Sequence, residues 1–143
     1  MPVKLVDAED GDLLQIARIE TAAFSPSEHS LVLFPGGGTP DAAEKRAERI
    51  RNEWKEDPSM RLINAVDTET GEIIGAARWH VYLTERPESE WTKNDVPDDW
   101  GPGANSPACV AFFGAIHESR KRLMAGTPHI RTKPRNPPRP RKN

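Results

Sequence analysis

Glu20 is the residue whose type and position point most directly to chemistry. It lies between Ile16 and Phe24 on the apolar face of a helix predicted over about residues 12–24. Burying a carboxylate there is costly unless the carboxylate is paired. Two interpretations stay open: the carboxylate contacts an amine or accepts its proton, or it forms an ion pair with an arginine such as Arg78.

Trp79-His80 is the second candidate. The two residues follow one another on a strand predicted over residues 72–82, so their side chains point to opposite faces of the sheet. Because histidine titrates near neutral pH, His80 is a candidate for proton transfer. The alternative is a histidine whose hydrogen bonds are satisfied within the sheet.

Other chemical motifs are weak. The triplet at residues 36–38, Gly-Gly-Gly, follows no strand and precedes no Gly-Lys-Ser/Thr, which argues against a phosphate-binding loop. The four histidines lack the paired spacing of metal ligands, and the single cysteine, Cys109, cannot complete a zinc site. No metal is therefore predicted. For Cys109 itself, a reactive thiol near a helix start and a buried inert thiol are both open.

Charge divides the chain near Gly126. Residues 1–125 carry 14 Lys/Arg and 22 Asp/Glu, a net charge of −8, whereas residues 126–143 carry six Lys/Arg and no acid. The same final segment contains five prolines. This asymmetry predicts a folded acidic part over residues 1–126 and a disordered basic tail over residues 127–143.

Periodicity and turn residues predict the elements that hold these candidates. In chain order they are a strand at 2–6, helices at 12–24 and 40–56, strands at 60–66 and 72–82, and a helix at 106–125. Asp67 to Gly71 supplies turn chemistry between the second and third strands, which predicts an antiparallel hairpin. Residues 25–39 and 83–103 are predicted to be loops. The fold class expected is α+β, a β-α-α-β-β-α layer.

Two segments carry a resemblance to a known family. The hairpin DTETGEIIGAARWHVYLTERPESEW, residues 67–91, is similar to the second and third strands of a fungal branch of the GNAT N-acetyltransferases. The segment LVLFPGGGTPDAAEKRAERI, residues 31–50, resembles the link into the second helix of that branch. The resemblance covers roughly residues 3–130, and it implies the first half of a GNAT-like domain.

The resemblance implies a reaction and a substrate side. Relatives transfer an acetyl group from acetyl-CoA to the amine of a small molecule or peptide. The substrate-side contacts would fall to Glu20, Phe24, Phe34, Trp79 and His80. Core packing is the alternative role for the two phenylalanines.

The cofactor motif of the family is absent from this sequence. In GNAT enzymes the fourth strand leads into a Gln/Arg-x-x-Gly-x-Gly/Ala loop, whose backbone N–H groups hold the pyrophosphate of acetyl-CoA. Here that strand would begin near His129-Ile130 and is followed by RTKPRNPPRPRKN, whose prolines cannot continue a central strand. We therefore expect an inactive homologue without bound cofactor, either truncated or frame-shifted, or shortened with a new tail.

The alternative function is a non-catalytic interaction protein. Arg131-x-x-Pro134-x-x-Pro137 in the tail matches the polyproline ligands of SH3-type domains. Nucleic-acid binding is disfavoured, since no aromatic residue follows Phe113. The alternative is a disordered, solvated tail that binds no partner.

Location and assembly are constrained only weakly. The N-terminus, MPVKLVDAED, has no apolar core typical of a signal peptide, and no apolar run is long enough to span a membrane. We expect no membrane partner and a cytoplasmic location, with the nucleus as the other candidate. An uncovered sheet edge near the hairpin would invite a homo-oligomer.

Overall fold

The computed structural model describes residues 2–24, 27–37, 39–92, 96–98, 100 and 103–132. These residues form two compact units. The first unit holds residues 2–24, 39–81 and 130–132, and the second holds the described residues within 27–37 and 82–129. Each unit has its own hydrophobic cluster.

The first unit contains a four-stranded antiparallel sheet. Its strands are β1 (Val3–Asp7), β2 (Met60–Asp67), β3 (Ile73–Tyr82) and β4 (His129–Thr132), in the order β1-β2-β3-β4. Strand β2 pairs with β1 through Leu5↔Ala65 and with β3 through Ile63↔Ala77. The expected hairpin is thus confirmed, and β4 is an additional strand.

The β2–β3 turn follows from its residues. Gly71 adopts a φ of 75°, a conformation that glycine takes without steric penalty. Its N–H donates to the Asp67 carbonyl oxygen at 2.8 Å, and an Asp67 carboxylate oxygen accepts from the N–H of Glu69 at 2.9 Å. These bonds close the turn and set the register of the hairpin.

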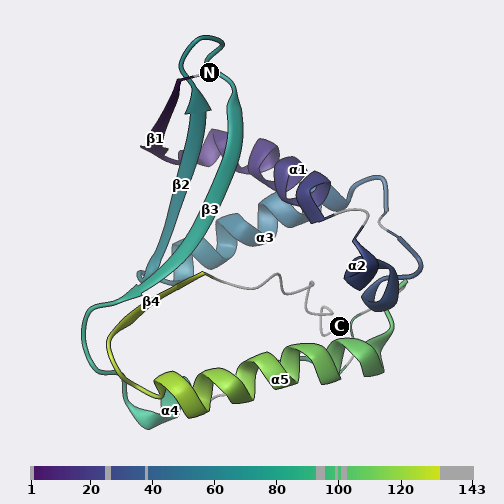
Figure 1. The fold of residues 1–143 in the computed structure, drawn as a ribbon, viewed down its shortest axis with the longest axis vertical. Helices are drawn as coiled ribbons and strands as arrows, with labels where there is room; N and C mark the ends of the chain where they lie inside the picture. Colours follow the sequence, from purple (N-terminus) through teal and green to yellow (C-terminus); the bar gives the residue numbers. More distant parts are fainter. Residues whose placement is uncertain are drawn as a thin grey trace. The chain divides into compact units, whose positions relative to one another are not determined.

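Helices α1 (Leu13–Phe24) and α3 (Ala42–Glu56) cover one face of the sheet (Figure 1). A short 3-10 helix, η1 (Asp10–Asp12), precedes α1. The core of this unit lies between the helices and the sheet and includes Leu13, Ile16, Ala47, Ile50, Met60 and Leu62. Both helices lie between β1 and β2 in the chain, and both were expected from their apolar periodicity.

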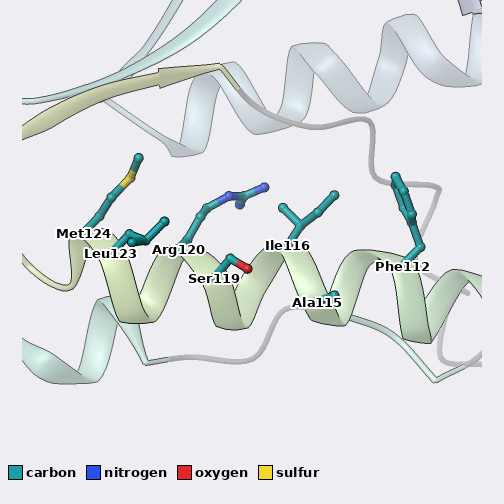
Figure 2. A pocket seen from close by; sticks show the side chains of 7 residues that line it. All are labelled: Phe112, Ala115, Ile116, Ser119, Arg120, Leu123 and Met124. Carbon is teal, nitrogen blue, oxygen red and sulfur yellow. The ribbon is translucent and has the colours of Figure 1, made fainter.

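The second unit is built on the long helix α5 (Ser106–Met124), with α2 (Glu28–Leu33) and α4 (Glu88–Trp91). Its core gathers Leu33, Trp100, Cys109 and Phe113, with the Trp100 and Phe113 rings stacked at 4.6 Å between centroids. Figure 2 shows a shallow groove along α5 in which only two of the seven lining residues are polar. The seven lining residues are Phe112, Ala115, Ile116, Ser119, Arg120, Leu123 and Met124, and the two polar ones are Ser119 and Arg120.

The glycine-rich loop has a packing role in this unit. A Cβ on Gly36 would overlap the backbone Cα of Gly103, and the Gly36 N–H donates to the Gly103 carbonyl oxygen at 2.9 Å. Gly37 has a φ of 69°. Two of the three glycines are therefore explained by backbone approach and conformation.

Several expectations need correction. The sheet has four strands where three were predicted, and the predicted loops contain α2 and α4. Asn105, and not Ser106, caps α5: its side chain accepts from the N–H of Ala108 at 3.3 Å. The predicted tail lies outside the described residues from 133 onward. Among the described residues, no helix is long and apolar enough to cross a membrane.

Candidate functional site

The helix-covered face of the sheet combines apolar and polar side chains. Strand alternation places Leu62, Asn64, Arg78 and His80 on this face, and all four are buried. Helix α3 contributes Arg46, which is also buried. A buried polar set of this size is unusual beside an apolar core, so it is the candidate site of this unit.

Glu20 is held by arginines from two elements. Its Oε2 accepts from the Nε of Arg46 at 2.6 Å and also from the Nη2 of Arg46. The Nη2 of Arg78 lies 4.0 Å from the other carboxylate oxygen. Glu20 on α1, Arg46 on α3 and Arg78 on β3 therefore tie the two helices to the sheet.

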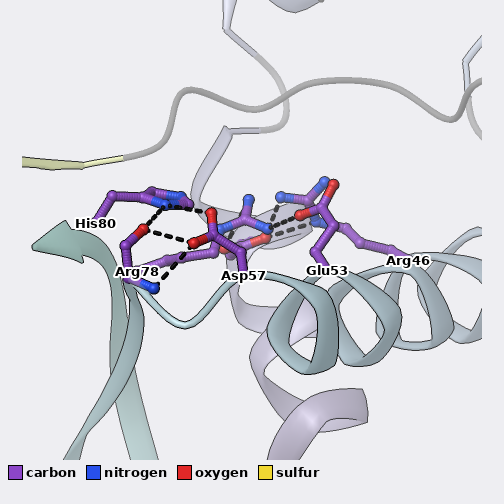
Figure 3. A network of polar contacts seen from close by, with 7 residues as sticks. Arg46, Glu53, Asp57, Arg78 and His80 are labelled. Atoms are coloured by element: carbon purple, nitrogen blue, oxygen red, sulfur yellow. Dashed lines mark hydrogen bonds and ion pairs between the residues drawn. The ribbon is translucent and has the colours of Figure 1, made fainter. Parts of the chain in front are cut away.

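Glu53 completes the charge balance of this group (Figure 3). Its Oε2 accepts from the Nη1 of Arg78 at 3.1 Å. The group then holds two carboxylates and two guanidinium ions, which is what burial of charge requires. We call Glu20, Arg46, Glu53 and Arg78 the arginine–glutamate cluster.

Arg78 is one of the two buried cations of the cluster. Burial is the main cause that lowers the pKa of Arg78 below its usual range, and Glu20 and Glu53 oppose that shift. The Nε–H of Arg78 is buried and donates no hydrogen bond among the described residues. The carboxylates are thus what keep this guanidinium compatible with its surroundings.

A second polar group follows at the end of α3. His80 Nδ1 lies 3.0 Å from Asp57 Oδ2 and 3.1 Å from Ser59 Oγ, while Ser59 Oγ donates to Asp57 Oδ1 at 2.6 Å. Asp57 also accepts from the Ser59 N–H at 2.9 Å. These contacts fix the short turn between α3 and β2.

This second group is not a nucleophilic triad. In a Ser-His-Asp triad the serine and the aspartate contact opposite nitrogens of the imidazole. Here both contact the same nitrogen of His80, and the serine donates its proton to the aspartate. Ser59 and Asp57 thus share one imidazole nitrogen and do not form the serine–histidine–aspartate relay of a triad.

The predicted substrate-side residues do not form one group within the first unit. Glu20 and His80 belong to the two polar groups under the sheet, whereas Trp79 is half-buried on the opposite face. Phe24 is 53% exposed at the end of α1. Phe34 belongs to the second unit, where its ring lies 6.4 Å from that of Trp100.

The chemistry available to Glu20 follows from these contacts. Its carboxylate oxygens are engaged by Arg46 and Arg78, so accepting a proton from a substrate would require breaking a buried ion pair. Of the two interpretations of Glu20, the structure has the ion pair. Arg46 is a closer partner of Glu20 than Arg78 is. The cluster holds elements in place and does not present a free base.

The sequence analysis did not single out Arg46. Arg46 is only 4% exposed. The available signal was spacing: Arg46 and Glu53 are seven residues apart and flank Ile50, which lies on the apolar stripe of α3. One acid and one base at that spacing beside an apolar stripe predict partners on a neighbouring element.

The sole cysteine lies in the second unit and is buried. Burial raises the pKa of the Cys109 thiol above its usual range, and its Sγ donates to the Leu33 carbonyl oxygen at 3.4 Å. Both effects oppose formation of a thiolate. The inert alternative for Cys109 therefore matches the structure.

The described residues contain no group of three His, Cys, Asp or Glu side chains placed to hold a metal ion.

No family model, no curated protein and no solved structure matches the chain. What the chain does must therefore be argued from its own elements and contacts.

Proposed function

We propose that these 143 residues form the acceptor side of a GNAT-like N-acetyltransferase domain and transfer no acetyl group by themselves. The observation that supports this proposal is the order of the helices and strands. Helices α1, α2 and α3 lie between β1 and β2 in the chain; α1 and α3 pack on the sheet, and α2 belongs to the second unit. The four strands follow one another across the sheet in chain order. The resemblance of residues 31–50 and 67–91 supports the same assignment.

The position of β4 adds support to this proposal. The family resemblance required a strand to begin near His129, and β4 occupies His129–Thr132 beside β3. In full-length relatives this strand precedes the cofactor loop. The proposal thus accounts for a short strand that local sequence patterns did not predict.

The residues present do not fit acetyl-CoA. A pyrophosphate site of this kind needs closely approaching glycine backbone and the N-terminus of a helix. The residues after Gly126 in this sequence include no glycine and five prolines. We derive no catalytic step through the cofactor for this chain.

The acceptor in such a reaction is an amine of a small molecule or peptide. An active enzyme removes a proton from the amine and stabilises the oxyanion with backbone donors. In this chain the carboxylate of Glu20 is engaged by arginine, and the contacts of His80 serve the α3–β2 turn. The proposal therefore assigns scaffolding roles to both residues.

An acetyl-transfer assay tests the proposal. The purified chain would be incubated with acetyl-CoA and a panel of small amines and free-amine peptides, and release of CoA thiol would be measured. We expect CoA thiol to be released at the same rate as in a control without protein. Turnover above that control, with a heat-inactivation profile that follows thermal unfolding of the chain, would contradict the proposal.

A further inference from the structure

The groove on α5 is lined by two rows of side chains. Figure 2 shows the first row pointing to the same side of the helix. Apolar side chains stay at the surface along the groove, since Phe112 is 41% exposed and Leu123 is 73% exposed. We call this surface the α5 groove: Phe112, Ile116, Arg120 and Met124 in the first row, and Ala115, Ser119 and Leu123 in the second.

The shape of the α5 groove fits a helix. Side chains four residues apart form the ridges of an α-helix, and the space between two such ridges accepts a ridge of another helix. The second row is low in its middle because Ala115 and Ser119 are small, so a second backbone can approach closely. Backbone N–H groups inside α5 bond within the helix and therefore offer no pairing to an added strand.

The charges of α5 lie at its C-terminal end. Residues 106–116 carry no charged side chain, whereas residues 117–124 carry one acid and three bases, a net charge of +2. The acid, Glu118, forms an ion pair with Lys121 at 3.1 Å. Arg120 lines the α5 groove itself, and Arg122 is exposed beside Leu123. An occupant that complements this end carries acidic side chains there.

The orientation of the occupant follows from the same charges. Acidic residues are favoured in the first turn of a helix, where they complement the positive end of its dipole. A helix antiparallel to α5 places its first turn beside the C-terminal end of α5. Acids in that turn then meet Arg120 and Arg122.

A second copy and the C-terminal segment lack the matching chemistry. Two copies packed in parallel through α5 would bring Arg122 of each copy together, and two antiparallel copies would place Arg122 beside residues 106–116, which contain no acid. Residues 131–143 carry six Lys/Arg, no acid, and no Leu, Ile, Val, Met or Phe. The occupant that fits is a helix of a different protein.

We propose that the α5 groove binds an acidic amphipathic helix of another protein, antiparallel to α5. The apolar row of that helix lies between the two rows of α5 side chains, and its acidic first turn lies beside Arg120 and Arg122. Helices that dock in this way present apolar anchors at i, i+3 or i+4, and i+7. The anchors supply the affinity, and the acidic turn determines the orientation.

Fluorescence anisotropy with three labelled synthetic helices tests this proposal on the full chain. The first peptide has leucines at i, i+4 and i+7 and glutamates in its first turn. The second has lysines in place of those glutamates, and the third keeps the glutamates but has glutamines in place of the leucines. We expect the first peptide to bind about tenfold more tightly than either of the others.

Either control peptide can contradict the proposal. If the lysine peptide bound as tightly as the first, charge would not select the partner. If the glutamine peptide bound as tightly as the first, the binding would be nonspecific attraction to basic residues such as those in segment 127–143, and the α5 groove would not be the site.

A matched pair of variants locates the site. Leu123→Ala should weaken binding of the first peptide about fivefold or more, because it removes an apolar side chain from the α5 groove. Leu31→Ala on α2, at a position that is 62% exposed in the same unit, should leave binding unchanged. Both side chains are exposed, so both variants should keep the unfolding temperature of the parent. Unchanged binding by Leu123→Ala would overturn the proposal.

A charge reversal tests the orientation. Arg122→Glu should weaken binding of the first peptide about tenfold and should strengthen binding of the lysine peptide. No change in the preference between these two peptides would overturn the antiparallel arrangement. Sedimentation equilibrium of the chain alone tests the remaining occupant: a dimer that Leu123→Ala dissociates would assign the α5 groove to a second copy and overturn the proposal.

Discussion

Replacing Arg46 with methionine is expected to destabilise the protein by about 3–5 kcal/mol, because it leaves the buried Glu20 carboxylate without its nearer partner. Arg46 is 4% exposed, and its guanidinium contacts Glu20 through two nitrogens. A loss of this size is a large share of the stability of a small domain. Urea unfolding followed by circular dichroism would measure it.

Charge balance makes a second variant informative. In the double variant Arg46→Met/Glu20→Met, Arg78 keeps its ion pair with Glu53, so the cluster holds one charge of each sign. We expect the double variant to regain most of the stability lost by Arg46→Met, to within about 1–2 kcal/mol of the parent. No recovery would show that Arg46 acts through packing and not through Glu20.

Arg18→Met provides the matched control. Arg18 and Glu44 also join α1 to α3, at 3.7 Å, but both side chains are more than half exposed. An exposed pair contributes at most about 1 kcal/mol. If Arg18→Met and Arg46→Met had equal effects, burial of the cluster would not explain its importance.

Ile50→Ala is expected to cost about 2–5 kcal/mol, since the side chain is completely buried and its removal leaves a cavity. Ile50 packs with Leu13, Ile16 and Met60 in the core of the first unit. Ile50→Val should cost only about 0.5–1.5 kcal/mol. Equilibrium unfolding of both variants would give the two values.

The control for this prediction is Leu123→Ala on α5, at a position that is 73% exposed. That change should alter stability by less than about 0.5 kcal/mol. A loss at Ile50 no larger than that at Leu123 would mean that the core between the sheet and its two helices is not formed in solution.

The long elements were predictable because their sequence patterns are redundant. Helix α3 carries an apolar stripe over four turns, and the β2–β3 hairpin combines two apolar strands with the turn residues Asp67 and Gly71. Each pattern contains several independent signals that agree. Their predicted bounds accordingly differ from the structure by only one or two residues.

The short elements were not predictable from local patterns. Helix α2 has six residues and α4 has four, which is too short for an apolar periodicity to appear. Strand β4 has four residues and is followed by a proline-rich segment. Because prolines disfavour strands, the sequence pattern indicated a disordered tail there. Its pairing with β3 is a tertiary contact that sequence spacing does not reveal.

The candidate site was predicted in part. Glu20 was singled out because a carboxylate lay on an apolar helix face, and His80 because histidine titrates near neutral pH. Both are part of buried polar groups. Their partners Arg46, Glu53 and Asp57 come from α3 and its C-terminal end. Choosing them required knowing how α3 is rotated against the sheet, and only packing determines that rotation.

Thermal unfolding with and without millimolar acetyl-CoA tests the central claim most directly. A ligand that binds only the native state stabilises it by about 2.7 kcal/mol at a hundredfold excess over Kd. We predict a cooperative transition whose midpoint does not change with acetyl-CoA. An upward shift with acetyl-CoA, absent with the same concentration of ATP, would contradict the assignment of this chain as an acceptor side without a cofactor site.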